Sequence, residues 1–137
     1  MNKFLIKIIC LFPLNKDLVG IRESDGMITF PEGVLNNDEN LTAAAKRIFF
    51  NKLRIDTGKN DWRLFKDEMK EDCLMVYLKY NGSINKIEKN KAHLLGEELV
   101  LVHHGEKNLS EFINKDIISE FFVSNGYSYN IKNNGLI

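Results

Sequence analysis

The residues best suited to chemistry lie in one segment, Phe30–Gly58, which reads FPEGVLNNDENLTAAAKRIFFNKLRIDTG. It begins as a loop that binds phosphate and metal would, with an extended Phe-Pro, Gly33 and an acidic run that leads into a helix. Such a site needs carboxylate oxygens, because these are the ligands that hard divalent cations prefer. The helix offers Ile48, Asn51 and Lys52 instead. The segment therefore raises the question of whether the chemistry of its loop survives.

The helix that positions these residues is indicated by a change of hydrophobic period after Asn40. Apolar residues at offsets of three and four form one stripe, as expected of a helix packed on a core. The stripe consists of Leu41, Ala44, Ala45, Ile48, Phe49 and Leu53. Asn40 is a suitable N-cap, since its side-chain oxygen can accept a hydrogen bond from an amide of the first turn. We predict a helix over about 40–53.

The elements around this helix are predicted to be mainly strands. Apolar runs separated by turn residues predict strands. They are FLIKIICLF from Phe4 to Phe12, LVGIRE after Asp17, a short strand through Phe30, WRLF, CLMVYLKY and ELVLVHH. We interpret KDEMKED, residues 66–72, as a charged connector. Helical spacing returns over about 108–124, where Asn114-Lys115-Asp116 is a point at which two helices could divide. The polar residues 127–137 are interpreted as a tail.

The spacing of Gly33, Glu39 and Arg47 resembles the front half of the Nudix box, the loop-helix motif of enzymes that hydrolyse a nucleoside diphosphate linked to another group. FPEG stands where that family usually has Phe-Pro-Gly-Gly, and Ala44-Ala45 resemble its small helix residues. DLVGIRE before the box and GEELVLVHHGEKNLSEF after it are also similar, so that the resemblance covers nearly all of residues 3–124. It implies an α/β/α sandwich with a mixed β-sheet, built from one domain over 1–126.

The second half of the box departs from the family pattern. Ile48, Asn51 and Lys52 stand where the family has glutamates, and Arg54 stands where it has glycine. The resemblance implies that positions 48, 51 and 52 face the substrate together, so their replacement removes the carboxylates that hold Mg²⁺. An ammonium at Lys52 would repel the cation. We therefore predict no metal site.

The same positions are candidates for ligand binding without a metal. Lys52 could pair with a phosphate directly, or it could lie on a solvated helix face. Gly33 is either a position of close backbone approach to a ligand or a turn residue. The resemblance implies that Arg47 ties the loop to the helix, and Asp38 or Glu39 could supply the carboxylate. The candidate ligand-binding residues are Lys52, Asn51, Arg47, Gly33 and Glu39.

Carboxylates outside the box could support hydrolysis in place of the missing box glutamates. Glu97 and Glu98 lie where some members of the family place a general base, and they are the candidate catalytic residues if the protein is active. Glu32, Glu71 and Asp72 are more often solvated charges. Under this alternative the cofactor would be Mg²⁺ or Mn²⁺, and otherwise none is predicted.

Composition bears on nucleic-acid binding, membrane insertion and disulfide formation. Nineteen basic and nineteen acidic residues give a net charge of zero, so a nucleic-acid role would need a local patch. No apolar run is long enough for a membrane span. Cys10 and Cys73 are interpreted as two reduced core thiols, and Trp62, Tyr77 and Tyr80 as core aromatics. The expected location is cytoplasmic.

Three functions follow from these observations. The first is a Nudix-like pseudoenzyme that has lost metal-dependent hydrolysis and binds a nucleotide-like small molecule or a partner protein. The second is an active Nudix hydrolase that cleaves a nucleoside diphosphate derivative, for example a nucleotide sugar, through carboxylates outside the box. The third is a module for protein interaction only. A homodimer is compatible with each of them.

Overall fold

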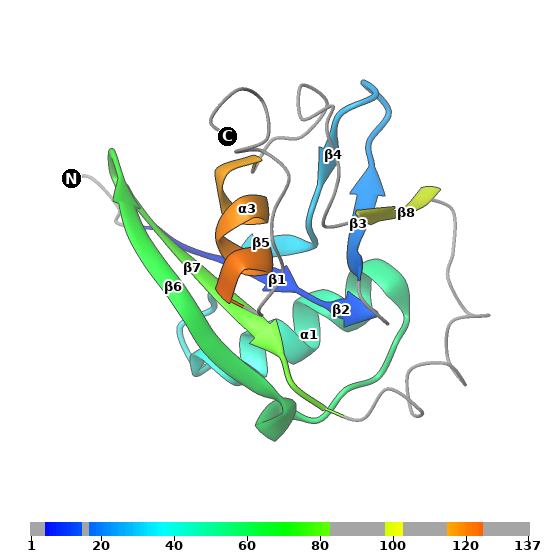
Figure 1. Cartoon of the computed structure of the whole chain (residues 1–137). Coiled ribbons are helices and arrows are strands. Elements are labelled where there is room, and N and C mark those ends of the chain that lie inside the picture. Colours follow the sequence, from blue (N-terminus) through cyan, green and yellow to red (C-terminus); the bar gives the residue numbers. More distant parts are fainter. Residues whose placement is uncertain (1–4, 15–16, 83–97, 103–114, 125–137) are drawn as a thin grey trace.

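The computed structural model describes residues 5–14, 17–82, 98–102 and 115–124. Two helices, a short 3-10 turn and eight strands lie within these ranges (Figure 1). The strands are β1 (Leu5–Leu11), β2 (Pro13–Leu14), β3 (Asp17–Arg22), β4 (Ile28–Thr29), β5 (Glu32–Val34), β6 (Trp62–Lys70), β7 (Cys73–Tyr80) and β8 (Glu98–Val102). The helices are α1 (Leu41–Leu53) and α3 (Lys115–Ser124), and the 3-10 turn η1 spans Lys59–Asp61.

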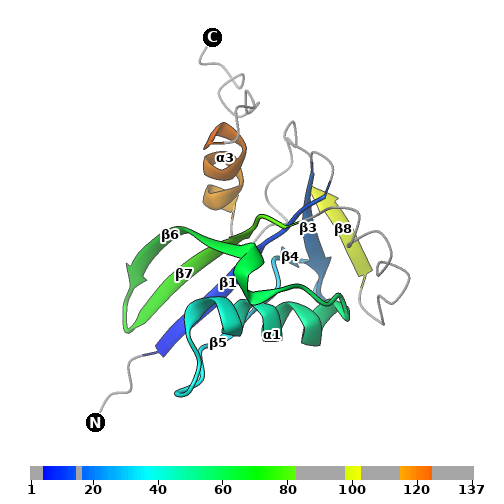
Figure 2. The ribbon, with the colours of Figure 1, turned by 90° about the horizontal axis from the view of Figure 1, so that it is seen from below.

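The strands form two four-stranded sheets. One has the order β5-β1-β7-β6, and in the other β3 lies between β2 and β4 and also pairs with β8. β1 pairs with β7 in parallel, whereas β1 and β5, like β6 and β7, are antiparallel. The predicted mixed sheet is thus confirmed, and the strands beyond it form a second sheet. Figure 2 shows α1 on one side of the first sheet and α3 on the other, as expected of a sandwich.

The core consists of two clusters that β1 separates. Ile8 and Cys10 belong to the cluster beneath α1, and Ile9 and Leu11 belong to the cluster beneath α3. Successive strand residues point to opposite faces of a sheet, so a strand covered on both faces must be apolar throughout. This explains the almost continuous apolar run in the N-terminal sequence. Both cysteines are free thiols; Cys10 is buried in the core, as predicted, whereas Cys73 is half-buried.

Helix α1 begins and ends where the sequence predicts. The side-chain oxygen of Asn40 accepts a hydrogen bond of 2.9 Å from the amide of Ala43, which caps the first turn. Of the predicted stripe, all but Leu41 are buried, and Leu41 packs against the core while partly exposed. The helix ends at Arg54, which has a left-handed backbone with a φ of 60°.

Strand β6 is longer than predicted. The residues 66–70, interpreted as part of a connector, continue the strand to Lys70, and Glu71 with a φ of 53° lies in the turn to β7. In the described sheet β6 pairs only with β7, so its outer edge faces solvent and tolerates charged side chains. The charged run was therefore a misleading signal.

The C-terminal helix is described from Lys115, close to the predicted point of division, and its apolar side is buried. Residues 108–114, His103-His104 and the tail lie outside the described residues. The aromatic residues Trp62, Tyr77 and Tyr80 are all buried in the core, as interpreted from the sequence.

Candidate functional site

The loop before α1 is fixed to the helix by Arg47. Its Nε donates to Glu39 Oε2 at 2.5 Å, while its Nη2 donates to Glu39 Oε1 and to the carbonyl of Val34, both at 2.9 Å. Glu39 also accepts from the amide of Asn36 at 3.0 Å. The hydrogen bond from Arg47 holds the pKa of Glu39 below its ordinary value. The expected ion pair between Arg47 and an acidic loop residue is therefore formed by Glu39, and its geometry is bidentate.

Gly33 lies within β5 and packs against Ile48. A β-carbon at Gly33 would lie 2.9 Å from Cγ1 and 3.0 Å from Cδ1 of Ile48. The backbone of Gly33 has no positive φ, and the residue pairs with Ile8 of β1. Neither of the two sequence interpretations of Gly33 describes this role, because the glycine makes room for an isoleucine side chain.

Ile48 belongs to the core. Its exposed fraction is 3%, and it packs in the cluster that α1 covers. The expectation that positions 48, 51 and 52 face a substrate together is wrong for this residue. A carboxylate at this depth would require a partner or a metal, whereas an isoleucine contributes apolar packing.

Lys52 lines a depression of about 320 Å³ at the end of the second sheet. The other lining residues come from β3 and the residue that follows it, from β4, and from the link between β4 and β5 with the first residue of β5; they are Ile21, Glu23, Thr29, Phe30, Pro31 and Glu32. We call this depression the Lys52 pocket. It joins one ammonium, two carboxylates and a threonine hydroxyl, and Lys7 lies 3.4 Å from one oxygen of Glu32.

Asn51 lies on a different face of α1. It lines a depression of about 650 Å³ together with Ala43, Lys46, Arg47, Phe50, Asp56 and Lys59. Residues four apart share a helix face, and Asn51 accordingly lies beside Arg47, as the sequence predicts. Lys52 is one residue further on and is turned toward the second sheet. The structure therefore separates Asn51 from Lys52 and places only Lys52 with Glu32 and Glu23.

The donor set of the Lys52 pocket does not fit a magnesium site of the kind the box implies. Within residues 5–14, 17–82, 98–102 and 115–124, no three His, Cys, Asp or Glu side chains lie close enough to hold a metal ion. Mg²⁺ requires oxygen ligands in near-octahedral geometry. Two carboxylates beside an ammonium do not supply such a set, so this pocket offers no basis for a catalytic step through a metal.

The alternative catalytic residues are only partly described. Glu98 begins β8, and its backbone pairs with Arg22 of β3. Glu97 lies outside the described residues. Since Glu23 follows Arg22 and lines the Lys52 pocket, the start of β8 is close to the rim of that pocket. Glu71 and Asp72 are exposed in the β6–β7 turn.

Two polar residues of the Lys52 pocket, Glu23 and Thr29, were not predicted as site residues. Glu23 follows the last residue of β3, and Thr29 of β4 pairs with Ile21. Their proximity to Lys52 depends on pairing between strands and on the packing of a helix distant in sequence. No local spacing in the sequence indicates it.

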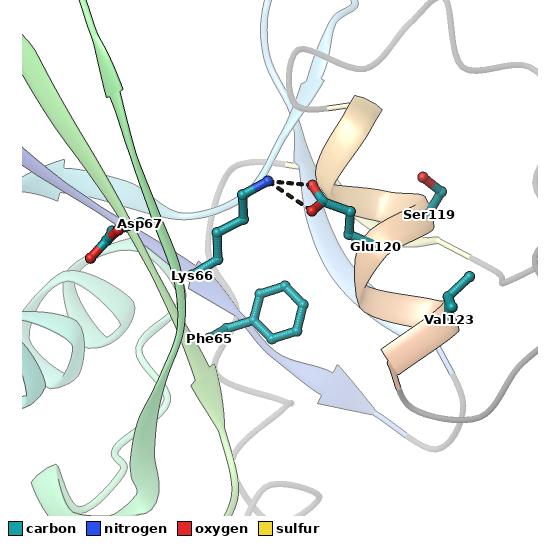
Figure 3. Close-up of a pocket in the computed structure, with 6 residues that line it drawn as sticks. All are labelled: Phe65, Lys66, Asp67, Ser119, Glu120 and Val123. Atoms are coloured by element: carbon teal, nitrogen blue, oxygen red, sulfur yellow. Dashed lines mark hydrogen bonds and ion pairs between the residues drawn. The ribbon is translucent and has the colours of Figure 1, made fainter.

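A larger depression, of about 780 Å³, lies between β6 and α3 (Figure 3). Lys66 Nζ donates to both carboxylate oxygens of Glu120 at 2.6 and 2.8 Å across it, beside the ring of Phe65. The ion pair raises the pKa of Lys66 above its ordinary value. None of the predicted site residues lines this depression; Lys66 and Glu120 satisfy each other, and Asp67 is the third charged residue that lines it.

Known structures were compared with the fold. No protein-family model and no curated protein sequence matches the chain. The structure of MutT from Aliivibrio salmonicida and Vibrio cholerae matches with a TM-score of 0.66 and 9% identity, over 89% of this chain and 99% of that one.

Two further matches are to larger proteins. A MutT/nudix family protein from Enterococcus faecalis has a TM-score of 0.52 and 11% identity over 58% of this chain. A bifunctional NMN adenylyltransferase/ADP ribose pyrophosphatase from Francisella tularensis has a TM-score of 0.60 and 10% identity over 92%. The chain spans 37% and 42% of these two proteins, respectively. The chain therefore has the Nudix fold. In the described part of the chain, neither helix has the length and apolar character needed to cross a membrane.

Proposed function

We propose that this chain of Nudix fold binds a phosphate-bearing, nucleotide-like ligand in the Lys52 pocket without a divalent metal and without hydrolysing it. The observation that carries this proposal is the position of Lys52. The Nudix-box resemblance expects a glutamate there, and the side chain that lines the pocket is an ammonium instead. An ammonium binds a phosphate through charge-assisted hydrogen bonds.

The other groups of the pocket are compatible with such a ligand. The carboxylate of Glu32 lies 3.4 Å from Lys7, which offsets part of its repulsion toward a phosphate. Glu23 and Thr29 would serve the neutral part of the ligand, because a carboxylate accepts hydrogen bonds from ribose hydroxyls or base amino groups. The volume of about 320 Å³ is at the lower end of the range for small-molecule pockets. It suits one nucleotide better than a dinucleotide.

A thermal-shift screen in EDTA tests this proposal. The panel consists of nucleoside monophosphates, diphosphates and triphosphates, ADP-ribose and nucleotide sugars. A ligand present at a hundred times its dissociation constant stabilises the folded state by about 2.7 kcal/mol. We expect at least one member to raise the melting temperature of the wild type and of Lys70→Ala, a control at the exposed end of β6. The shift should be lost in Lys52→Ala. Retention of the full shift in Lys52→Ala would refute the role of this lysine.

A second candidate function is hydrolysis of a nucleoside diphosphate derivative with Glu98 or Glu97 as general base. It is favoured by the pairing of Glu98 with Arg22, which brings the start of β8 to the rim that carries Glu23. Incubation of the same panel with Mg²⁺ or Mn²⁺ tests it directly. Turnover that Glu98→Gln or Glu97→Gln abolishes would establish this function in place of the first. If no panel member shifts the melting temperature or is hydrolysed, binding of a partner protein becomes the favoured function.

A further inference from the structure

The outer face of α1, opposite to the side of Lys52, carries an exposed aromatic ring among basic side chains. The exposed fraction of Phe50 is 39%, and its ring lies in the depression of about 650 Å³ that Asn51 also lines. Lys46 and Arg54 are four residues before and after Phe50, so they lie about 6 Å away along the helix axis on the same stripe. Lys59 of η1 lines the same depression.

The charge of the whole chain conceals a strong local imbalance here. The segment 41–63, which forms α1, η1 and the first residues of β6, contains six basic and two acidic residues, a net charge of +4. Of the six, Lys52 lies on the opposite side of α1 and Arg47 is paired with Glu39, so the outer face carries part of this excess. Because the chain is neutral overall, the remaining residues carry a compensating −4. A local concentration of cations is what a nucleic-acid role requires of a chain without net charge.

The cations of this face are held in place by the fold. Lys46 Nζ donates to Asp56 Oδ1 at 2.6 Å and to the carbonyl of Thr57 at 2.8 Å, which ties the helix to the loop that follows it. The guanidinium of Arg54 lies 5.5 Å from the centroid of the Phe50 ring. Among the described residues, no carboxylate forms an ion pair with Lys59 or Arg54. These two cations are therefore available to an anion.

We propose that this face binds single-stranded nucleic acid, with one base stacked on Phe50 and neighbouring phosphates at Lys59 and Arg54. A positive surface with an exposed aromatic ring is the arrangement that such ligands use, since every base has a face that can stack. A duplex does not offer an unstacked base. An acidic peptide would be attracted by the cations but would gain little from the ring. The site is distinct from the Lys52 pocket, so the inference goes beyond the proposed function.

Fluorescence anisotropy with a labelled oligouridylate, the matching oligothymidylate and a duplex of the same length tests this inference. The titrations are made in EDTA with wild-type protein at low and at physiological salt. We expect both single strands to bind more tightly than the duplex. Two phosphate contacts predict that the logarithm of the binding constant falls against the logarithm of salt concentration with a slope of about −1.4. Tighter binding of either single strand than of the duplex supports the proposal.

Matched variants separate stacking from charge. Phe50→Ala should weaken binding roughly five- to a hundredfold, the range for loss of one base–aromatic stack. Leu64→Ala removes an apolar side chain on β6 that is more exposed than Phe50, and it should have no effect. Lys59→Glu should weaken binding and flatten the salt dependence, whereas Lys70→Glu, a charge reversal at the far end of β6, should not. Lys52→Ala should leave oligonucleotide affinity unchanged.

Three results would overturn the inference. They are the absence of binding at low salt, equal affinity for the duplex and the single strands, and an affinity that Phe50→Ala does not reduce. Polyglutamate is added as a competitor. Displacement of the oligonucleotide by polyglutamate as effectively as by unlabelled oligouridylate would assign the face to acidic peptides instead.

Discussion

Ile48 occupies the space directly above Gly33, with its Cγ1 only 2.9 Å from the position where a β-carbon of Gly33 would lie. At this point the segment that resembles a phosphate-and-metal loop packs against the core through the apolar contact between Gly33 and Ile48. In the Nudix-box resemblance position 48 is a glutamate, whose carboxylate could not replace this contact. Any larger residue at position 33 would collide with the isoleucine side chain.

Gly33→Ala tests this contact. The added methyl group must displace Ile48 or the β5 backbone, and overpacking of this kind destabilises by about 1–3 kcal/mol. Ile48→Ala alone should cost about 2–5 kcal/mol, because it leaves a cavity in the core. The double variant should be less destabilised than the sum of the two, since the new methyl group enters the space that Ile48 left. Urea denaturation measures all three values, and strict additivity would show that the two residues do not collide.

Arg54→Gly should stabilise the protein. Arg54 ends α1 with a φ of 60°, a conformation that costs an L-residue about 1–2 kcal/mol and that glycine adopts freely. Part of this gain is offset by the greater backbone entropy of glycine in the unfolded chain. We expect a net gain of about 1 kcal/mol, or roughly 2–6 °C in melting temperature.

Arg54→Ala is the control for this prediction. It removes the same guanidinium from the Phe50 ring and keeps a β-carbon in the left-handed conformation, so it should not stabilise. If Arg54→Ala raises the melting temperature as much as Arg54→Gly, the backbone explanation is wrong.

The ion pair between Arg47 and Glu39 predicts a loss of stability in acid. The pKa of Glu39 is lowered in the folded protein, mainly by the hydrogen bond from Arg47. A lowered pKa means that the stabilising contribution is fully present above the unfolded value, near pH 4.5, and is lost as pH falls through the lower folded value.

Glu39→Gln should therefore lose about 1.5–3 kcal/mol at neutral pH, the usual size of a hydrogen bond to a charged group. Its free energy of unfolding should then fall less steeply below pH 4.5 than that of the wild type. Chemical denaturation across this range measures both curves. Parallel curves would mean that Glu39 contributes nothing to the acid sensitivity.

The sequence predicts the elements well where local chemistry determines them. The helix over 40–53 was predicted because Asn40 supplies a cap and the apolar stripe has one clear period. The full length of β6 is not predicted, because its outer edge faces solvent and its charged residues show no strand pattern. The division of the strands into two sheets depends on pairing between distant segments, such as β3 with β8, which no local signal specifies.

The candidate site was predictable to a smaller degree. The pairing of Arg47 with an acidic loop residue is implied by the resemblance to the Nudix box, and the structure contains it. The apolar stripe correctly predicts that Ile48 lies in the core. The resemblance to the Nudix box instead implied that position 48 faces a substrate. The meeting of Lys52 with Glu23 and Thr29 depends on how the helix packs against the second sheet, which only the folded chain reveals.

Asn51 and Lys52 line different depressions on two faces of α1, so a carboxylate at each position should affect metal binding differently. Lys52→Glu would place a third carboxylate in the pocket that holds Glu23 and Glu32, and it would remove the ammonium that repels a cation. This variant loses a charge that repels the cation and gains one that attracts it. The resulting gain in Mn²⁺ binding free energy should exceed about 1.4 kcal/mol, so the variant should bind Mn²⁺ at least about tenfold more tightly than the wild type. Asn51→Glu adds a carboxylate to the outer face and should not gain affinity. Manganese titration followed by electron paramagnetic resonance measures the three proteins, and equal gains in both variants would contradict the separation.

Calorimetric titration of the nucleotide that gives the largest thermal shift, once in EDTA and once in excess Mg²⁺, tests most directly whether Lys52 takes the place of the metal. We predict the same dissociation constant in both buffers, and an affinity at least about tenfold weaker for Lys52→Ala, as expected from the loss of a charge-assisted hydrogen bond of about 1.5–3 kcal/mol. Binding that appears only with Mg²⁺, or that is unchanged in Lys52→Ala, would contradict this account.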